Sequence, residues 1–336
     1  MNVSFRLLYS IEMGNSEFRI PKRGGNGEWG TPEWGFTPVS SAGSIISLLV
    51  SGELQCPLPI THCPLSILEV TIVNIQILQV DAFTDRPFRG NPAAVCLLEH
   101  PAEAEWMQQV AAEMNLSETA FLCREKGGYR LRWFTPTVEV DLCGHATLAS
   151  AHTLWEVGAV EAGQPIEFYT RSGVLGATRQ GEWIELNFPA KPPKVMTSPE
   201  GLDRSLGAAI FCVSYDGADY LVEVASEDVV RQLQPDFVQL ATLPVRGIIV
   251  TSLAASSEYD FVSRFFAPAV GINEDPVTGS AHCALGPFWQ QRLHRDEFLA
   301  YQASARGGFV RVKLKGDRVY LGGQAITVFQ GELRSS

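Results

Sequence analysis

The residue types best suited to chemistry occur in two related segments of the 336-residue chain. The first, RWFTPTVEVDLCGHAT, begins at Arg132, and the second, SRFFAPAVGINEDPVTGSAH, contains a matching arginine. At an offset of 132 residues the segments share four pairs: Arg132 with Arg264, Phe134 with Phe266, Pro136 with Pro268, and Val138 with Val270. After an insertion of three residues, Gly144 corresponds to Gly279 and Cys143 to Thr278. Each copy therefore predicts a β-rich run, an irregular turn and then a helix.

The two glycine turns predict a binding site for a small carboxylated molecule. The first turn of a helix leaves its N–H groups unpaired, and a glycine there lets a ligand approach them closely. The helix dipole also favours an anion at that end. Because Gly144 and Gly279 are related by an internal repeat, we expect one site between two half-molecules, with one turn on each side.

Glu118 is the predicted general acid/base. It lies between Ser117 and Thr119, directly before the apolar run AFLC, and therefore at the edge of a core. Partial burial there raises the pKa of a carboxyl group toward the working pH of a proton-transfer residue. The alternative is a solvated glutamate at the end of a strand, with no role in chemistry.

Two further side chains are candidates because of their place in the repeated turns. Asp275, in NEDPVTGSAH, precedes the second turn, where it could orient a protonated group or a substrate amine, although Asp before Pro also caps turns. His145 directly follows Gly144 and is predicted to lie in the irregular turn. By contrast, His152 and His282 lie on helical stretches and are expected to pack or cap.

Cys143 raises a competing mechanism. A thiolate at a helix N-terminus has a lowered pKa and could remove an α-proton, but a two-base racemase needs a second base on the opposite face. The repeat places Thr278 there, and a threonine hydroxyl is too weak an acid or base for that task. The pattern therefore disfavours a two-thiol reaction.

Composition limits the class of partner. The chain is 46% hydrophobic and 19% charged, which is typical of a globular protein with a large core, and its net charge of −11 would repel nucleic acid. Its seven cysteines form neither C-x-x-C pairs nor zinc-type pairs with histidine, so we expect no metal and a reducing, cytoplasmic compartment. No apolar run reaches the length of a membrane span, and we expect neither a membrane segment nor a signal peptide.

Hydrophobic periodicity predicts mainly strands. We expect a strand at 75–83, a loop at 84–93 and a second strand at 93–98. Helices are predicted at 101–115, 227–237 and 280–293, three antiparallel strands at 166–190 and a hairpin at 208–224. Residues 1–72 are rich in Gly, Pro and Ser and show no sustained period, so they are predicted to be a poorly structured and dispensable extension. The sequence leaves open whether they belong to the natural protein. The pattern favours an α+β fold with internal pseudo-symmetry.

Four segments resemble the signatures of the phenazine biosynthesis PhzF-like isomerase family: VDAFTDRPFRGNPAAV, NLSETAF, FTPTVEVDLCGHATLA and EDPVTGSAHCAL. The resemblance runs from about residue 75 to about residue 333. It implies the fold of the diaminopimelate epimerase-like superfamily, in which two pseudo-symmetric domains each wrap a curved antiparallel sheet around a central helix, with the active site between them. The domains would span 73–190, completed by a C-terminal strand at about 320–333, and 191–319, with PAKPPK as linker.

The resemblance also implies roles for individual residues. Glu118 would remove a proton from one carbon and return it at another, without a cofactor, while His145 and Asp275 would position the substrate and its protons. The substrate-binding residues would be Ser117, Cys143, Gly144, Thr278, Gly279 and Ser280, with backbone N–H groups supplied by the glycines. The resemblance further implies a homodimer. The epimerase branch has two catalytic cysteines, whereas these turns contain only Cys143.

Three functions remain open at this level. The first is a cofactor-independent isomerase that moves a proton within a small carboxylated substrate. The second is a non-catalytic binding or scaffold protein, because a fold alone does not guarantee activity. The third is an amino-acid epimerase or racemase that uses Cys143. A nearby carboxylate would hinder a pure carboxylate-binding site, so Glu118 favours the first.

Overall fold

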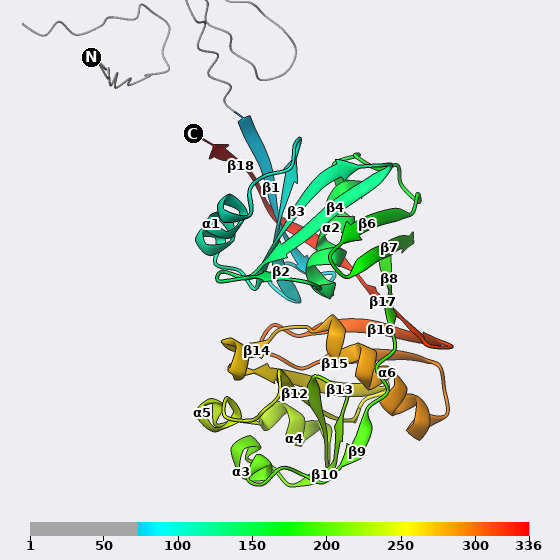
Figure 1. Ribbon diagram of the computed structural model, residues 1–336. Coiled ribbons are helices and arrows are strands. Elements are labelled where there is room, and N and C mark those ends of the chain that lie inside the picture. Colours follow the sequence, from blue (N-terminus) through cyan, green and yellow to red (C-terminus); the bar gives the residue numbers. More distant parts are fainter. Residues whose placement is uncertain (1–72, 336) are drawn as a thin grey trace, which may run out of the picture. The chain divides into compact units, whose positions relative to one another are not determined.

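The computed structural model describes residues 73–335, shown in Figure 1. The predictions made for residues 1–72 lie outside these described residues. Within them the chain forms eighteen strands and six α-helices. We call β1 to β8 together with β18 the first half, and β9 to β17 the second half.

The first half contains β1 to β8, the helices α1 and α2, and the last strand of the chain. Its elements are, in order, β1 (Val73–Ala82), β2 (Asn91–Leu98), α1 (Ala104–Met114), β3 (Glu118–Glu125), β4 (Gly128–Phe134), β5 (Glu139–Val140), α2 (Gly144–Glu156), β6 (Ile166–Thr170), β7 (Gly173–Gln180) and β8 (Trp183–Pro189). The chain returns at its end to complete this half with β18 (Ala325–Ser335), which pairs antiparallel with β1. A strand from the far end of the sequence is therefore added to this sheet beside β1.

The second half repeats this plan. Its elements are β9 (Lys194–Met196), α3 (Leu202–Leu206), β10 (Ile210–Tyr215), β11 (Asp219–Val224), α4 (Glu227–Gln232), α5 (Phe237–Leu240), β12 (Gly247–Leu253), β13 (Phe261–Ala267), the 3-10 helix η1 (Pro268–Val270), β14 (Ile272–Asp275), α6 (Gly279–Leu293), β15 (Glu297–Gln302), β16 (Gly308–Lys315) and β17 (Arg318–Gly323). An antiparallel pairing of β8 with β17 joins the two halves into one continuous sheet.

Strand pairings follow the same order in both halves. In the first half β2 pairs parallel with β3, β3 antiparallel with β4, and β4 parallel with β6; in the second half β11, β12, β13 and β15 pair in the same way. The sheet is thus mixed rather than purely antiparallel. The cause is that helices connect these strands, and a helical crossover returns the chain in the same direction.

The helices α2 and α6 form the centre of the two halves. Ten residues of α2 are buried, most of them small, and α2 packs against β1, β2, β3, β8 and β18. In the second half α6 packs against β11, β16 and β17. Strand β16 shows why: buried and exposed residues alternate along GFVRVKLK, so Val310, Val312 and Leu314 lie in the core while Arg311 and Lys313 lie on the opposite face.

The repeat seen in the sequence is structural. Arg132 forms a two-point ion pair with Glu139, at 2.7 Å for each N–O distance, and Arg264 forms the same pair with Glu274, at 2.6 and 2.9 Å. Both guanidinium groups also lie over the ring of the phenylalanine two residues on, at 5.2 and 4.9 Å. The spacing of arginine and phenylalanine that the two halves share therefore gives the same local geometry in both.

Some local predictions were wrong. Strand β2 already begins at Asn91, so the loop before it is shorter than predicted. The single helix predicted at 227–237 is two short ones, α4 and α5, because Pro235 lies between them and cannot donate an N–H inside a helix. The short α3 was not predicted. The three strands after α2 and the hairpin of β10 and β11 are confirmed.

Candidate active site

The N-termini of α2 and α6 meet at their glycines. A Cβ added to Gly144 would lie 3.4 Å from Cα of Gly279, and a Cβ added to Gly279 would lie 3.4 Å from Cα of Gly144. The residues before them, Cys143 and Thr278, are extended, and neither side chain caps its helix. Two positive helix ends therefore approach each other with uncapped first turns, an arrangement that favours an anion between them.

Glu118 is the first residue of β3, and only 14% of its side chain is exposed. Burial, and to a smaller extent the negative charge of Asp275, raise the pKa of the Glu118 carboxyl from 4.5 to about 8, while a hydrogen bond with Cys143 opposes the shift. The carboxyl group therefore carries a proton at neutral pH and can release it within the physiological range. This is the property required of a general acid/base.

His145 is the second residue of α2 and not part of an irregular turn, so that local prediction was wrong. Burial lowers the pKa of His145 to about 3, which makes the imidazole neutral. Its Nε2 lies 3.2 Å from Oε2 of Glu118, without forming an aligned hydrogen bond. Its Nδ1 faces the Asn91 amide nitrogen at 3.2 Å and the Cys143 sulfur at 3.5 Å. A neutral imidazole donates from one ring nitrogen and accepts at the other.

Asp275 ends β14 on the other side of the site. Its carboxylate accepts hydrogen bonds from the Asn91 amide, at 2.8 Å, and from the Thr278 hydroxyl. Burial raises the pKa of Asp275 to about 6, against these two hydrogen bonds and the charge of Arg246, which lower it. Asp275 is therefore mainly ionised at neutral pH while Glu118 is mainly protonated.

Asn91 is a central residue that the sequence reasoning missed. Its side chain is fully buried, and its amide nitrogen donates to Asp275 and, at 2.9 Å, to the carbonyl of Val277. Because both partners are oxygen acceptors, the end of the amide that faces them is the nitrogen and not the oxygen. Asn91 thus links the Asp275 side of the site to the His145 side. The signal lay in RGNPAA, which was interpreted as a turn and as part of a family signature, without a role for Asn91.

Gln302, at the end of β15, was also missed. It accepts from the Thr278 N–H at 2.9 Å and donates to the Asp275 carbonyl at 2.8 Å and to the Thr278 hydroxyl at 3.1 Å. The second turn is therefore held by a side chain from a neighbouring strand. His282, as predicted for a packed or capping histidine, is buried and bonds the Thr278 carbonyl at 2.8 Å.

The two predicted serines differ in their surroundings. Ser280, the second residue of α6, accepts a hydrogen bond from Arg246 at 3.1 Å. Ser117 is half-buried next to Glu118, and its hydroxyl makes no hydrogen bond within residues 73–335. The structure thus brings Glu118, Cys143, His145 and Asp275 together with the two glycines, and leaves Ser117 at the edge.

Cys143 is a poor base in this setting. Burial raises the pKa of the thiol well above 9, and the charge of Glu118 raises it further. Ligand atoms of Glu118, Cys143 and His145 lie within 4.8 Å of one another, close enough to consider a metal ion. However, the sulfur faces Nδ1 of the imidazole and the carboxylate faces Nε2, so one nitrogen does not complete a compact site with both. We assign no metal to these residues.

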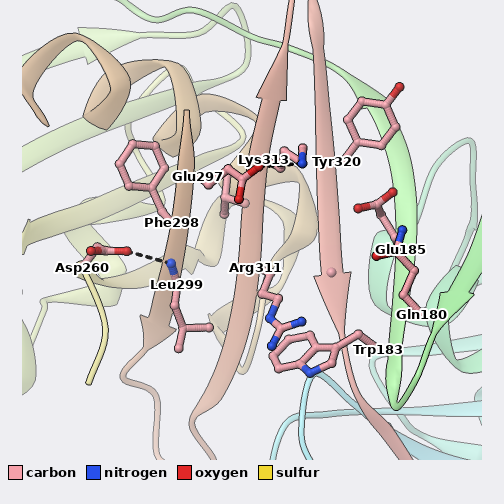
Figure 2. A pocket seen from close by; sticks show the side chains of 12 residues that line it. Gln180, Trp183, Glu185, Asp260, Glu297, Phe298, Leu299, Arg311, Lys313 and Tyr320 are labelled. Atoms are coloured by element: carbon pink, nitrogen blue, oxygen red, sulfur yellow. Dashed lines mark hydrogen bonds and ion pairs between the residues drawn. The ribbon is translucent and has the colours of Figure 1, made fainter. Parts of the chain in front are cut away.

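A separate pocket of about 330 Å³ lies over β8, β17, β16 and β15. Figure 2 shows its lining, in which Arg311 stacks on Trp183 at 3.6 Å and Asp260 accepts from the Leu299 N–H. None of the residues named above for the candidate active site lines it. Arg311 lies on the face of β16 opposite the core, so this pocket is remote from the chemistry.

Comparison with known proteins agrees with this geometry. The two related halves, each with a central buried helix, define an α+β fold of the diaminopimelate epimerase-like type, as predicted. Residues 80–331 match the family model described as phenazine biosynthesis-like protein, and the chain belongs to that family. Relatives that are 58%, 50% and 49% identical to the chain are named isomerases, and it is an enzyme of that class. Among residues 73–335, no helix is long and apolar enough to cross a membrane.

Individual relatives support the same assignment. The chain is 58% identical over 263 residues to an uncharacterized isomerase of Halalkalibacterium halodurans, covering 78% of this chain and 99% of that protein. A crystal structure of a PhzF-family protein from Enterococcus faecalis superposes with a TM-score of 0.75 at 42% identity, covering 78% of this chain and all of that one. A predicted epimerase of Pseudomonas aeruginosa, at 21% identity and a TM-score of 0.61, covers 78% and 100% and shares the fold.

Proposed function

We propose that the enzyme moves a proton within a small carboxylated substrate, with Glu118 as the only proton carrier and no cofactor. The substrate carboxylate binds between the helix ends at Gly144 and Gly279. Ionised Glu118 removes a proton from one carbon and, once protonated, returns it to another, so the substrate keeps its composition and the carboxylate is regenerated. The observation that carries the proposal is a buried carboxyl group next to two uncapped helix N-termini. This group, of Glu118, has a pKa of about 8.

The side chains around Glu118 support its assignment as the proton carrier. The neutral His145 directs Nε2 toward the Glu118 carboxyl and can hold it or a substrate oxygen in place. The ionised Asp275 faces the same space and suits a substrate amine or a protonated group. A two-thiol epimerase is less well supported, because the Cys143 thiol keeps its proton and its counterpart is Thr278.

The test is deuterium incorporation by the full chain. A panel of small hydroxy, amino and unsaturated carboxylic acids is incubated with the enzyme in deuterated water and followed by proton NMR. We expect at least one acid to lose a C–H signal, and Glu118→Gln to slow this loss by ~10² to 10⁴, the usual scale of general acid/base catalysis.

A matched control is Glu182→Gln, which changes an exposed glutamate in the turn before β8. It should exchange at the wild-type rate. If the wild type exchanges none of the acids, the proposed reaction is wrong. If Glu118→Gln exchanges as fast as the control, the reaction stands and the assignment of Glu118 is wrong.

The remaining elements of the proposal concern assembly and place. We propose a homodimer and a cytoplasmic location, with small-molecule partners and no nucleic acid. The family assignment and the net charge of −11 support these statements. Light scattering at micromolar concentration gives the mass, and a monomer would remove the dimer without changing the mechanism.

A further inference from the structure

Arg246 lies at the position of the second half that corresponds to Ser117 in the first. Strand pairing fixes this relation: Thr119 of β3 pairs with Phe134 of β4, and Ile248 of β12 pairs with Phe266 of β13. Phe134 and Phe266 are equivalent in the repeat. Counting back from Thr119 and Ile248, Glu118 is therefore equivalent to Gly247, and the residue before it, Ser117, to Arg246.

The helix residues that these positions face are also equivalent. Ser280 follows Gly279 as His145 follows Gly144. In the first half Glu118 lies 3.2 Å from His145, and in the second half Arg246 donates to Ser280 at 3.1 Å. Each half thus places a residue near the start of a strand against the second residue of its central helix, but Arg246 stands one position before the equivalent of Glu118. One contact holds a group that can carry a proton, and the other holds a fixed positive charge.

Arg246 is fixed from behind by a buried carboxylate. Asp219, the first residue of β11, is fully buried, and it accepts from Nε of Arg246 at 2.9 Å and also from Nη2. The guanidinium lies 5.3 Å from the centre of the Phe265 ring. A planar guanidinium held at one edge presents its other edge in a fixed direction. Here Nη1 makes no hydrogen bond to any residue of 73–335, and 39% of the side chain is exposed.

The contact with Ser280 has a chemical consequence. A guanidinium only donates hydrogen bonds, so the Ser280 oxygen is the acceptor and the serine keeps its own proton for another partner. Ser280 belongs to the helix end that is proposed to bind the substrate carboxylate. The charge of Arg246 also acts on Asp275, whose pKa it lowers against the effect of burial. The arginine therefore influences both polar groups of the second turn.

We propose that Arg246, anchored by Asp219, is a positioning residue of the active site that orients the Ser280 hydroxyl toward the substrate and keeps a positive charge beside Asp275. The proposal rests on the proposed function, because it assigns Ser280 to the same substrate site. It adds two residues, Arg246 and Asp219, that the sequence motifs did not single out. It also predicts that the arginine acts through the serine and not by contacting the reacting carbon.

The test is a double-mutant cycle with Arg246→Met and Ser280→Ala, measured on deuterium exchange of a substrate found by the panel. We expect Arg246→Met to reduce kcat/KM by about tenfold, the scale of a lost hydrogen bond to a charged group. The double variant should be no slower than Ser280→Ala alone, because residues that act through one another are not additive. Arg246→Lys should recover only part of the loss. A lysine ammonium lacks the planar set of donors with which the guanidinium binds Asp219 and Ser280 at the same time.

Two variants separate this role from simple loss of structure. Arg246→Met leaves Asp219 buried without its partner and so risks unfolding the chain; combining it with Asp219→Asn removes both charges and should restore the melting temperature without restoring kcat/KM. Arg311→Met removes an arginine from the face of β16 opposite the core and should leave exchange unchanged. The proposal would be overturned if Arg246→Met had the same kcat/KM as the control Arg311→Met. It would also be overturned if the losses in kcat/KM from Arg246→Met and Ser280→Ala were fully additive in the double variant.

Binding of propionate, read from the broadening of its NMR signals, tests the inference without any turnover. Arg246→Met and Ser280→Ala should weaken propionate binding by the same factor, and the double variant by no more. If this holds while the wild type exchanges no acid, Arg246 positions a binding site and the proposed reaction is wrong. If Glu118→Gln abolishes exchange but Arg246→Met binds propionate as the wild type does, the reaction stands and the inference is wrong.

Discussion

The two halves of the molecule share a backbone plan and differ in the chemistry they bring to the centre. In the first, Glu118 faces His145, and both are nearly or fully buried and uncharged at neutral pH. In the second, the equivalent places hold Gly247 and Ser280, with Arg246 and Asp275 as charged neighbours. In the proposed mechanism the repeated plan supplies two helix ends for one anion, while the proton carrier is present on one side alone. A shift of a proton along a substrate needs one carrier, whereas inversion by two bases needs two.

The largest expected difference between the halves is in the dependence of stability on pH. Below about pH 4.5 the Glu118 carboxyl is protonated in the folded and unfolded chain alike. Between pH 4.5 and about 8 the unfolded chain loses this proton and the folded chain keeps it, so the free energy of unfolding falls as pH rises. At about 1.4 kcal/mol per unit of pKa difference, the loss amounts to several kcal/mol.

Glu118→Gln should remove this dependence. Chemical denaturation at pH 5 and pH 8.5 should show a wild type that weakens with rising pH and a variant that weakens less. Asp275 shifts in the same direction over a lower range, so part of the slope will remain in the variant. Equal slopes for wild type and Glu118→Gln would show that Glu118 is not held protonated by the fold.

The second expected effect compares the side chains next to the two turns. Asp275→Asn removes the charge that faces Glu118 and should slow exchange by roughly 10- to 100-fold, below the range of a transferring group. Cys143→Ala should cost less than about fivefold, because its thiol stays protonated and its contacts with His145 and Glu118 are weak sulfur hydrogen bonds. Rates of deuterium incorporation for both variants test this order. A dead Cys143→Ala with an active Asp275→Asn would favour the thiol mechanism.

The third prediction concerns the one property that the halves should share. Gly144→Ala and Gly279→Ala each place a methyl group 3.4 Å from Cα of the opposite glycine, a contact that the fold tolerates but that adds bulk where the two helix ends meet. Each should weaken carboxylate binding about tenfold, the scale of one hydrogen bond to an anion, with little change in melting temperature. A loss confined to one variant would mean that only one helix end binds the anion.

The smallest effect separates the two repeated ion pairs. Arg264 donates to the carbonyls of Val230 and Leu233 in addition to Glu274. Within residues 73–335 the Arg132 side chain donates only to Glu139, which Arg171 also contacts. Arg264→Met should therefore destabilise the protein by roughly 2 kcal/mol and Arg132→Met by roughly 1 kcal/mol, since unpaired carbonyls add to the cost. Urea unfolding of both variants measures the difference. The reverse order would show that the extra carbonyl contacts contribute nothing.

The sequence predicted this site through local patterns and missed what only tertiary contacts create. The pairing of Arg132 with Arg264 and the glycine turns were visible as a repeat, and they indicated two helix ends facing one ligand. Asn91 was missed because its partners Asp275 and Val277 lie more than 180 residues away, and its own segment resembles an ordinary turn. Nothing local distinguishes a buried asparagine from a turn asparagine.

Arg246 and Asp219 escaped notice for a related reason. Each precedes or begins an apolar strand, where a charged residue normally marks the edge of the sheet. Their importance appears only when the register of β12 against β13 aligns Gly247 with Glu118. For His145 the reverse holds. The sequence named it as a site residue because it follows Gly144, but placed it in an irregular turn, whereas α2 begins at Gly144 and His145 lies inside the helix.

The most direct test of the account is a titration of Glu118 itself. Carbon NMR of the glutamate carboxyl groups, with the Glu118 signal assigned by its absence in Glu118→Gln, gives the pKa of this group in the folded enzyme. The account predicts a midpoint near pH 8 in the wild type and a lower one in Asp275→Asn, because the Asp275 charge contributes to the shift. A wild-type midpoint near 4.5, unaffected by Asp275→Asn, would contradict the claim that one buried carboxyl carries the proton.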